Sequence, residues 1–136
     1  MYLLDTDIIS HVLRRSPPLH LIARIAATPP EAQFTSAITL GELYYGAHRL
    51  GTGSSGLLGR LDQLLADGRV ALPFDLAAAR RYGELRADLE RRGTPIGDAD
   101  LRIAAIALDR GLTVVTGNAR HFQRVPGLAV ENWLEP

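Results

Sequence analysis

Residues 2–9, Tyr2-Leu3-Leu4-Asp5-Thr6-Asp7-Ile8-Ile9, form a short apolar run that ends in two carboxylates separated by one residue. An apolar run without polar alternation predicts a strand buried on both faces, which is typical of a parallel sheet covered by helices. Open α/β sheets bind their ligands beyond the carboxyl ends of their strands, which is where Asp5 falls. Because neighbouring carboxylates repel each other unless they share a proton or a cation, this stretch predicts half of a metal site.

Size and composition limit the classes of protein to which the chain can belong. Its 136 residues fit one domain, and a hydrophobic content of 46% agrees with a globular core. No cysteine is present, which excludes disulfides, thiolate zinc sites and a cysteine nucleophile. No signal peptide is recognisable and no apolar run is long enough to cross a bilayer, so we expect a cytoplasmic protein without a membrane partner.

The charge of the chain neither supports nor excludes a nucleic-acid substrate. The formal net charge is zero, so any polyanion would have to be held by a local patch. All 15 basic residues are arginines, which suit bidentate contacts with phosphate, although a GC-rich coding bias is the simpler explanation. Five arginines are candidates for holding a nucleic-acid backbone: Arg14, Arg15, Arg49, Arg120 and Arg124. For most of them, a role as a solvated surface residue explains the position equally well.

Strand-like and helix-like segments alternate along the chain. Strands are expected at residues 2–4, 33–36, 70–72, 112–116 and 125–130, and helical apolar patterns at 8–13, 19–27, 43–50, 57–65 and 101–108. A long helix is expected from the residue after Asp75 to about Arg92, and a turn with a short helical piece at 117–122. Thr6 or Asp7 is expected to cap the first helix, and Asp75 the long helix that Gly93 ends. Residues 51–56 are rich in glycine and serine and predict a flexible loop. The alternation predicts an α/β fold with a mainly parallel sheet.

Three carboxylates stand at boundaries between expected elements: Asp5 at a strand end, and Glu42 and Asp100 each in the first turn of a helix. Thr39-x-x-Glu42 also matches a capping box, in which the glutamate returns to the backbone N–H of Thr39. Asp98 and Asp100 could simply complement the helix macrodipole, a stabilisation of roughly 0.3–1 kcal/mol each. Asp5 is harder to explain in such a way, since a buried strand end offers a lone carboxylate little solvation.

Four ordered motifs resemble the PIN domain of VapC-type toxins and together cover almost the whole chain. They are Leu3-Leu4-Asp5-Thr6-Asp7, Ser36-Ala37-Ile38-Thr39-Leu40-Gly41-Glu42-Leu43-x-x-Gly46, Gly93-Thr94-Pro95-Ile96-Gly97-x-x-Asp100-x-x-Ile103-Ala104 and Val114-Val115-Thr116-x-Asn118-x-x-x-Phe122. The resemblance implies a single PIN domain over residues 1–136, folded as a three-layer α/β/α sandwich.

The resemblance also implies an activity and partners. It implies a cytoplasmic Mg²⁺-dependent endoribonuclease, with Mn²⁺ as an alternative ion, that is the toxin of a type II toxin–antitoxin system. A VapB-type antitoxin protein would neutralise it, as a homodimer or within a toxin–antitoxin hetero-oligomer. By motif position, Asp5, Glu42 and Asp100 match the catalytic and metal-binding acids of the family.

The chemistry of Mg²⁺ agrees with these acids. The ion prefers oxygen ligands, keeps several waters and is commonly held by one or two carboxylates plus substrate phosphate. We expect Asp5 and Asp100 to coordinate it, and Glu42 to ligate it or to orient the attacking water. The expected reaction is hydrolysis of an RNA phosphodiester, and the resemblance implies that it leaves 3′-hydroxyl and 5′-phosphate ends. Loops of tRNA or ribosomal RNA are the expected substrates.

The chain departs from the family pattern at three positions. Asp7 stands where the family usually has asparagine, Asp98 adds an acid beside Asp100, and Asn118 lies near the place of a fourth acid found in many PIN domains. One firmly held ion is expected, and the number of ions stays open. Asp7 is interpreted as a helix cap.

Other functions are weighed against this one. The main alternative is a degenerate PIN-like module that binds RNA or protein without cutting, which the complete set of three acids disfavours. Aspartyl-phosphate phosphatases share Asp5-x-Asp7, but they need threonine or valine at the position of Ile9, and a lysine, which the chain lacks. Histidine catalysis has little support, and surface or capping roles are expected for His11, His20, His48 and His121.

Overall fold

The central feature of the protein is a five-stranded sheet in which every pairing is parallel. The computed structural model describes residues 1–51 and 55–136. The strands are β1 (Tyr2–Leu4), β2 (Gln33–Ser36), β3 (Val70–Leu72), β4 (Thr113–Val115) and β5 (Val130–Glu131), in the spatial order β3-β2-β1-β4-β5. Because β1 is the middle strand, the residue that follows it lies at the centre of the carboxyl edge of the sheet.

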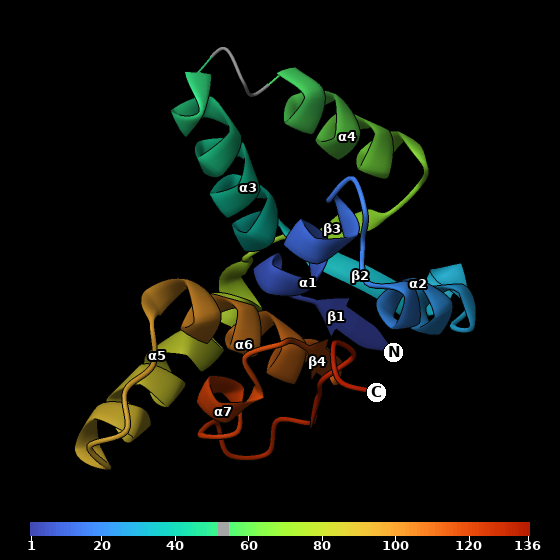
Figure 1. Cartoon of the computed structure of the whole chain (residues 1–136). Coiled ribbons are helices and arrows are strands. Elements are labelled where there is room, and N and C mark those ends of the chain that lie inside the picture. Colours follow the sequence, from blue (N-terminus) through green and yellow to red (C-terminus); the bar gives the residue numbers. More distant parts are fainter. Residues whose placement is uncertain (52–54) are drawn as a thin grey trace.

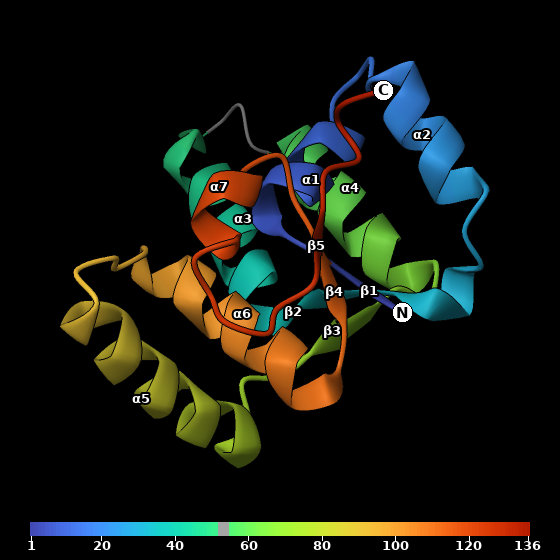
Figure 2. The ribbon, with the colours of Figure 1, turned by 90° about the horizontal axis from the view of Figure 1, so that it is seen from below.

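Helices cover both faces of this sheet (Figures 1 and 2). They are α1 (Thr6–Val12), α2 (Leu19–Ala26), α3 (Ala37–Arg49), α4 (Ser55–Ala66), α5 (Leu76–Arg91), α6 (Asp98–Arg110) and α7 (Ala119–Phe122), with a 3₁₀ turn at Pro30–Ala32. Figure 2 shows α5 and α6 on one side of the strands and α1, α2 and α4 on the other. The arrangement is the three-layer α/β/α sandwich, which confirms the expected fold class.

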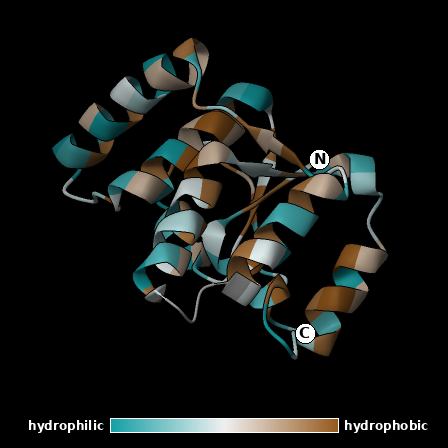
Figure 3. Cartoon of the chain, turned by 90° about the horizontal axis from the view of Figure 1, so that it is seen from above, coloured by the Kyte–Doolittle hydropathy of each residue, from teal (hydrophilic) through white to brown (hydrophobic). Residues whose placement is uncertain are grey.

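Two hydrophobic cores lie on the two faces of the sheet. Leu3 belongs to a buried cluster built mainly from α5 and α6, whereas Leu4 belongs to a second cluster with α1 and α2. Successive side chains of a strand point to opposite faces, so the apolar run of β1 supplies both cores. Figure 3 shows hydrophobic residues along the central strands, and hydrophobic and hydrophilic residues alternating along the helices that cover them.

The helix ends correct one expectation and exclude one alternative. The cap of α1 is Asp5, not Thr6 or Asp7, because the helix begins at Thr6, immediately after the strand. Helix α3 begins at Ala37 with Ser36 as its cap, which excludes the alternative of a capping box formed by Thr39 and Glu42. Both results have one cause: each helix begins earlier than its apolar periodicity indicates.

Other boundaries follow the sequence more closely. Asp75 caps α5 by accepting from the N–H of Ala78 at 2.9 Å, and Gly111 ends α6 with a φ of 67°. The last strand is shorter than residues 125–130, because a turn containing Gly127, with a φ of 79°, occupies most of that segment. The loop expected at 51–56 includes residues 52–54, which lie outside the described residues, and Ser55 already belongs to α4. Among the described residues no helix is long and apolar enough to cross a membrane.

Candidate active site

Asp5 is the most buried acid of the candidate site, with only 3% of its surface exposed. Its Oδ1 accepts a hydrogen bond from the N–H of Ile8 at 3.0 Å. Its side chain is also hydrogen-bonded to the side chain of Thr116, which follows β4. The pKa of Asp5 is raised to about 7, mainly by burial and in smaller part by the charges of Asp7 and Asp100, against the lowering effect of these two hydrogen bonds. The residue is therefore a carboxyl group that lacks a compensating charge.

Asp100 faces Asp5 from the first turn of α6. Partial burial raises its pKa, and the negative charge of Glu42 adds to the rise. His121, on α7, lowers that pKa because its Nδ1 lies 3.7 Å from Asp100 Oδ2. Asn118 holds the imidazole in turn, with its Nδ2 at 2.8 Å from the same Nδ1. His121 is on the surface, as expected, with 42% of its side chain exposed, and its ring also lies beside a candidate metal ligand.

Glu42 reaches the site from α3 and is held by a row of hydroxyl groups. The hydroxyl of Thr6 donates to Glu42 Oε1. Thr6 Oγ1 lies 3.2 Å from Thr39 Oγ1, which lies 3.3 Å from Ser36 Oγ. The direct contact to the Glu42 carboxylate therefore comes from Thr6 of α1.

The three sequence-predicted acids are therefore brought together at the carboxyl edge of the sheet. Asp100 is close enough for its charge to act on Asp5, and Glu42 is close enough for its charge to act on Asp100. Within residues 1–51 and 55–136, no three His, Cys, Asp or Glu side chains form a complete ligand cluster for a metal. The donor set contains only oxygen, which suits a hard divalent ion that keeps several waters and takes one or two carboxylates from the protein.

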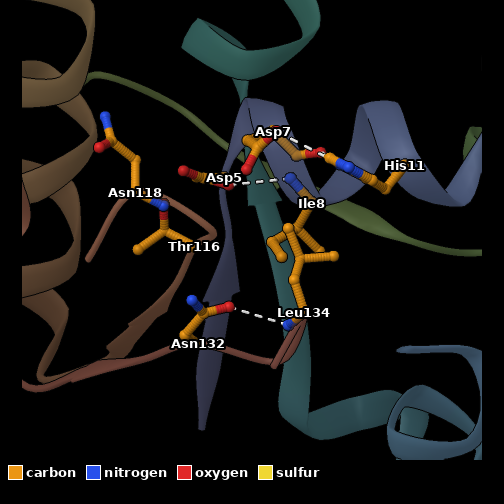
Figure 4. Close-up of polar contacts among 8 residues, drawn as sticks. All are labelled: Asp5, Asp7, Ile8, His11, Thr116, Asn118, Asn132 and Leu134. Carbon is orange, nitrogen blue, oxygen red and sulfur yellow. Dashed lines mark hydrogen bonds and ion pairs between the residues drawn. The ribbon is translucent and has the colours of Figure 1, made fainter. Parts of the chain in front are cut away.

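The three additional residues singled out in the sequence have different surroundings. Asp98 points away from the site, because it accepts from the hydroxyl of Tyr82 and pairs with Arg102 Nε at 2.9 Å. The hydrogen bond from Tyr82 and the nearby arginines lower its pKa, so Asp98 is a structural acid on the α5 side of α6. Asp7 and Asn118, in contrast, flank Asp5 (Figure 4).

The candidate arginines are exposed, as expected for residues that contact a backbone or solvent. Arg124 is already engaged, since its Nη1 donates to the carbonyl of Pro95 at 2.9 Å. Arg49 stacks on the ring of Tyr45, 6.0 Å from the ring centroid. Arg120 directly precedes His121 on α7.

Two threonines of the site are not identified by the sequence interpretation. Thr116 is fully buried and bonds to Asp5, and Thr6 bonds to Glu42. A signal for Thr116 was available, because it follows its strand in the same way as Asp5 does and β4 is the neighbour of β1. That adjacency depends on the strand order, which no local motif contains.

Comparisons with known proteins agree with this fold and these residues. Residues 2–128 match the PIN domain family. The tRNA(fMet)-specific endonuclease VapC of Salmonella typhimurium is 35% identical over 136 residues, covering 97% of this chain and 97% of that protein. Toxin FitB of Neisseria gonorrhoeae is 37% identical over 127 residues, covering 90% of this chain and 91% of that protein.

Solved structures give the same result. The crystal structure of FitAcB from Neisseria gonorrhoeae contains a chain that matches with a TM-score of 0.87 and 36% identity, covering 100% of both chains. DNA-bound VapBC from Salmonella typhimurium matches with a TM-score of 0.88 and 36% identity, covering 97% of both chains. PIN-domain ribonucleases generally depend on a divalent metal ion. The chain therefore belongs to the PIN-domain family, among the VapC-type ribonuclease toxins.

Proposed function

We propose that this chain is a Mg²⁺-dependent endoribonuclease and the toxin component of a type II toxin–antitoxin system. The observation that carries the proposal is the meeting of Asp5, Glu42 and Asp100 at the carboxyl edge of the sheet, two of them with raised pKa values. In the described part of the chain no arginine forms an ion pair with these three acids. Such a site carries negative charge that no neighbouring arginine compensates, and a bound divalent cation would compensate it.

The residues of the site have separate tasks in this reaction. When bound, Mg²⁺ lowers the pKa of a coordinated water and offsets charge that develops on the phosphate. Asp5 and Asp100 hold the ion, with Mn²⁺ as a substitute. Glu42, directed by Thr6, orients the attacking water and receives its proton. Thr116 and the N–H of Ile8 keep the carboxylate of Asp5 in one orientation.

The products follow from water as the nucleophile. The water oxygen bonds to phosphorus while the bond from phosphorus to the 3′ oxygen breaks, and that oxygen takes a proton and leaves as a 3′-hydroxyl. The other fragment keeps a 5′-phosphate. A 2′,3′-cyclic phosphate product would show attack by the 2′-hydroxyl instead and would contradict this mechanism.

The relatives support a substrate class and partners for the proposal. The Salmonella relative is named for its action on tRNA(fMet), and the matched structures are toxin–antitoxin complexes. We infer that exposed loops of tRNA or ribosomal RNA are the substrate, and that the cytoplasm, where these RNAs occur, is the site of action. We also infer a VapB-type antitoxin, and assembly as a homodimer or a toxin–antitoxin hetero-oligomer. An arginine of the antitoxin is the natural partner for the clustered acids.

Gel analysis of bulk tRNA and ribosomal RNA tests the activity. The purified full chain is incubated with each RNA in Mg²⁺, in EDTA, and as the Asp5→Asn variant. Asp109→Asn, which removes an exposed acid far along α6, is the matched control. Discrete products from wild type and control that disappear in EDTA and in Asp5→Asn support the proposal. RNA binding by a folded protein that cuts no RNA under any condition would show instead a PIN-like binding module.

A further inference from the structure

The carboxylate of Asp7 occupies a space that exists only because residue 117 is glycine. A Cβ atom built on Gly117 would lie 2.3 Å from Asp7 Oδ2 and 2.5 Å from Leu134 Cδ1. Real Cβ atoms do not approach other atoms so closely, so any other residue at this position would displace the carboxylate or Leu134. The missing side chain of Gly117 therefore leaves the space that Asp7 Oδ2 occupies, and we call this space the cradle.

The other oxygen of Asp7 is oriented by His11, one helical turn further along α1. His11 Nδ1 lies 2.7 Å from the carbonyl oxygen of Asp7 and 3.3 Å from Asp7 Oδ1. A carbonyl oxygen can only accept, so the proton of the ring is on Nδ1. The carboxylate is thus fixed from two sides, although 42% of the side chain remains open to solvent and to an incoming ion.

The cradle belongs to the same segment that positions Asp5. Gly117 stands between Thr116, which bonds to Asp5, and Asn118, which bonds to His121. Figure 4 shows the side chains of Asp5 and Asp7 next to each other, with Thr116 and Asn118 on the opposite side. The two carboxylates are close enough for their charges to repel. Bringing a second negative charge to a buried one is unfavourable unless a cation binds between or beside them.

We propose that Asp7 is a further residue of the metal site, acting with Asp5 on the same divalent cation, and that Gly117 is the positioning residue for its carboxylate. The proposal rests on the metal-dependent function proposed above. The interpretation of Asp7 as a helix cap does not account for these contacts, because the cap of α1 is Asp5. A favourable interaction with the helix dipole would need neither the cradle nor the contact with His11.

Binding of Mn²⁺ tests the proposal without any measurement of RNA cleavage. The metal is titrated into the full chain at fixed pH and low ionic strength, by isothermal calorimetry and by the electron paramagnetic resonance of free Mn²⁺. Asp7→Asn keeps the size of the side chain and removes only its charge, and we expect it to weaken binding by about tenfold or more. Asp109→Asn, the matched control on an exposed turn, is expected to bind Mn²⁺ as wild type does.

Gly117→Ala tests the positioning role through a double-mutant cycle. The alanine should weaken Mn²⁺ binding in the wild-type background and cause no further loss in the Asp7→Asn background, because its effect passes through Asp7. Gly83→Ala is the glycine control, since a Cβ there meets nothing within 4 Å. Equal losses in both backgrounds would contradict the positioning role. If Gly117→Ala does not fold, as judged by thermal unfolding in EDTA, Asp7→Asn alone decides.

The outcomes separate this inference from the proposed function. Wild-type affinity in Asp7→Asn, together with lost binding in Asp5→Asn, would overturn the role of Asp7 and leave the metal-dependent nuclease intact. No Mn²⁺ uptake by folded wild type would overturn both. Weakened binding in Asp7→Asn with an unchanged thermal unfolding temperature in EDTA would support the inference, because a merely structural role would affect the unfolding temperature first.

Discussion

Asp5 connects the backbone of this protein to its chemistry. The residue ends β1, caps α1 and presents a carboxyl group that is almost fully buried. Since the cap uses only Oδ1, which accepts from the N–H of Ile8, the residue keeps a second oxygen for Thr116 or for a cation. One residue therefore fixes both where the helix starts and where a metal ion would bind.

The stability of the metal-free protein should depend on the protonation of Asp5. Its pKa is raised from 3.8 to about 7, so the folded protein binds more protons than the unfolded chain between these two values. The contribution of Asp5 to the free energy of unfolding is therefore fully present below about pH 4 and is lost as the pH rises through about 7. The total loss is a few kcal/mol, on the order of 1.4 kcal/mol for each unit of pKa difference.

Urea unfolding in EDTA over this pH range measures the effect. Asp5→Asn should flatten the decline, whereas Asp109→Asn should keep it. An identical pH dependence in wild type and Asp5→Asn would mean that another group causes the decline.

Thr6 gives a second prediction at the scale of the residue. Thr6→Val keeps the shape of the side chain and removes the hydroxyl that holds Glu42. We expect RNA cleavage to fall by about tenfold, as for other residues that orient ligands of a metal site, with a loss of about 1 kcal/mol in stability. Single-turnover cleavage measures the change, with Thr94→Val, at an exposed threonine before α6, as control. Cleavage at the wild-type rate would show that Glu42 needs no help from α1.

At the scale of the element, most helices and strands could be predicted from the sequence because their signals are local. The apolar run of β1, the capping aspartate of α5 and the glycine that ends α6 act on their own neighbours in the chain. The start of α3 was placed too late, because Ser36, which caps the helix, belongs to a run that is also typical of a strand, and the apolar periodicity becomes clear only from Leu43. The last strand was misplaced because Val125 and Leu128 are apolar but pack from a turn.

Two glycines in helical surroundings should respond in opposite directions to replacement by alanine. Gly111 has a φ of 67°, a conformation unfavourable for a side chain, so Gly111→Ala should destabilise the protein by about 1 kcal/mol. Gly83 lies exposed inside α5, where alanine has the better helix propensity, and Gly83→Ala should stabilise by about 1 kcal/mol. The midpoints of urea unfolding compare the two. Effects of the same sign would contradict the assignment of Gly111 as the end of α6.

The candidate site was predictable in part for a similar reason. Asp5, Glu42 and Asp100 each carry a local motif, and the structure brings them together at one edge. Thr116 and His121 were missed, because their contacts depend on β4 lying beside β1 and on α7 folding back toward α6. Contacts of this kind arise from tertiary packing, which spacing along the chain does not contain.

At the scale of the whole molecule, a bound divalent ion should stabilise the fold, because the acids proposed to hold it follow β1 and lie on α6, and they come together only in the native state. At a concentration of about 100 times the dissociation constant, Mg²⁺ should add about 2.7 kcal/mol to the free energy of unfolding. Thermal unfolding with and without Mg²⁺ measures this, and Asp5→Asn should show no shift. An equal shift in the variant would show that the ion acts elsewhere on the protein.

The position of β1 at the centre of the sheet has a consequence for synthesis of the protein on the ribosome. β1 is synthesised well before its partner β4 and before the acid on α6. A nascent chain that still lacks β4 has neither the second neighbour of β1 nor Thr116 to hold Asp5. The candidate site therefore cannot form on a nascent chain until α6 and β4 have both been synthesised.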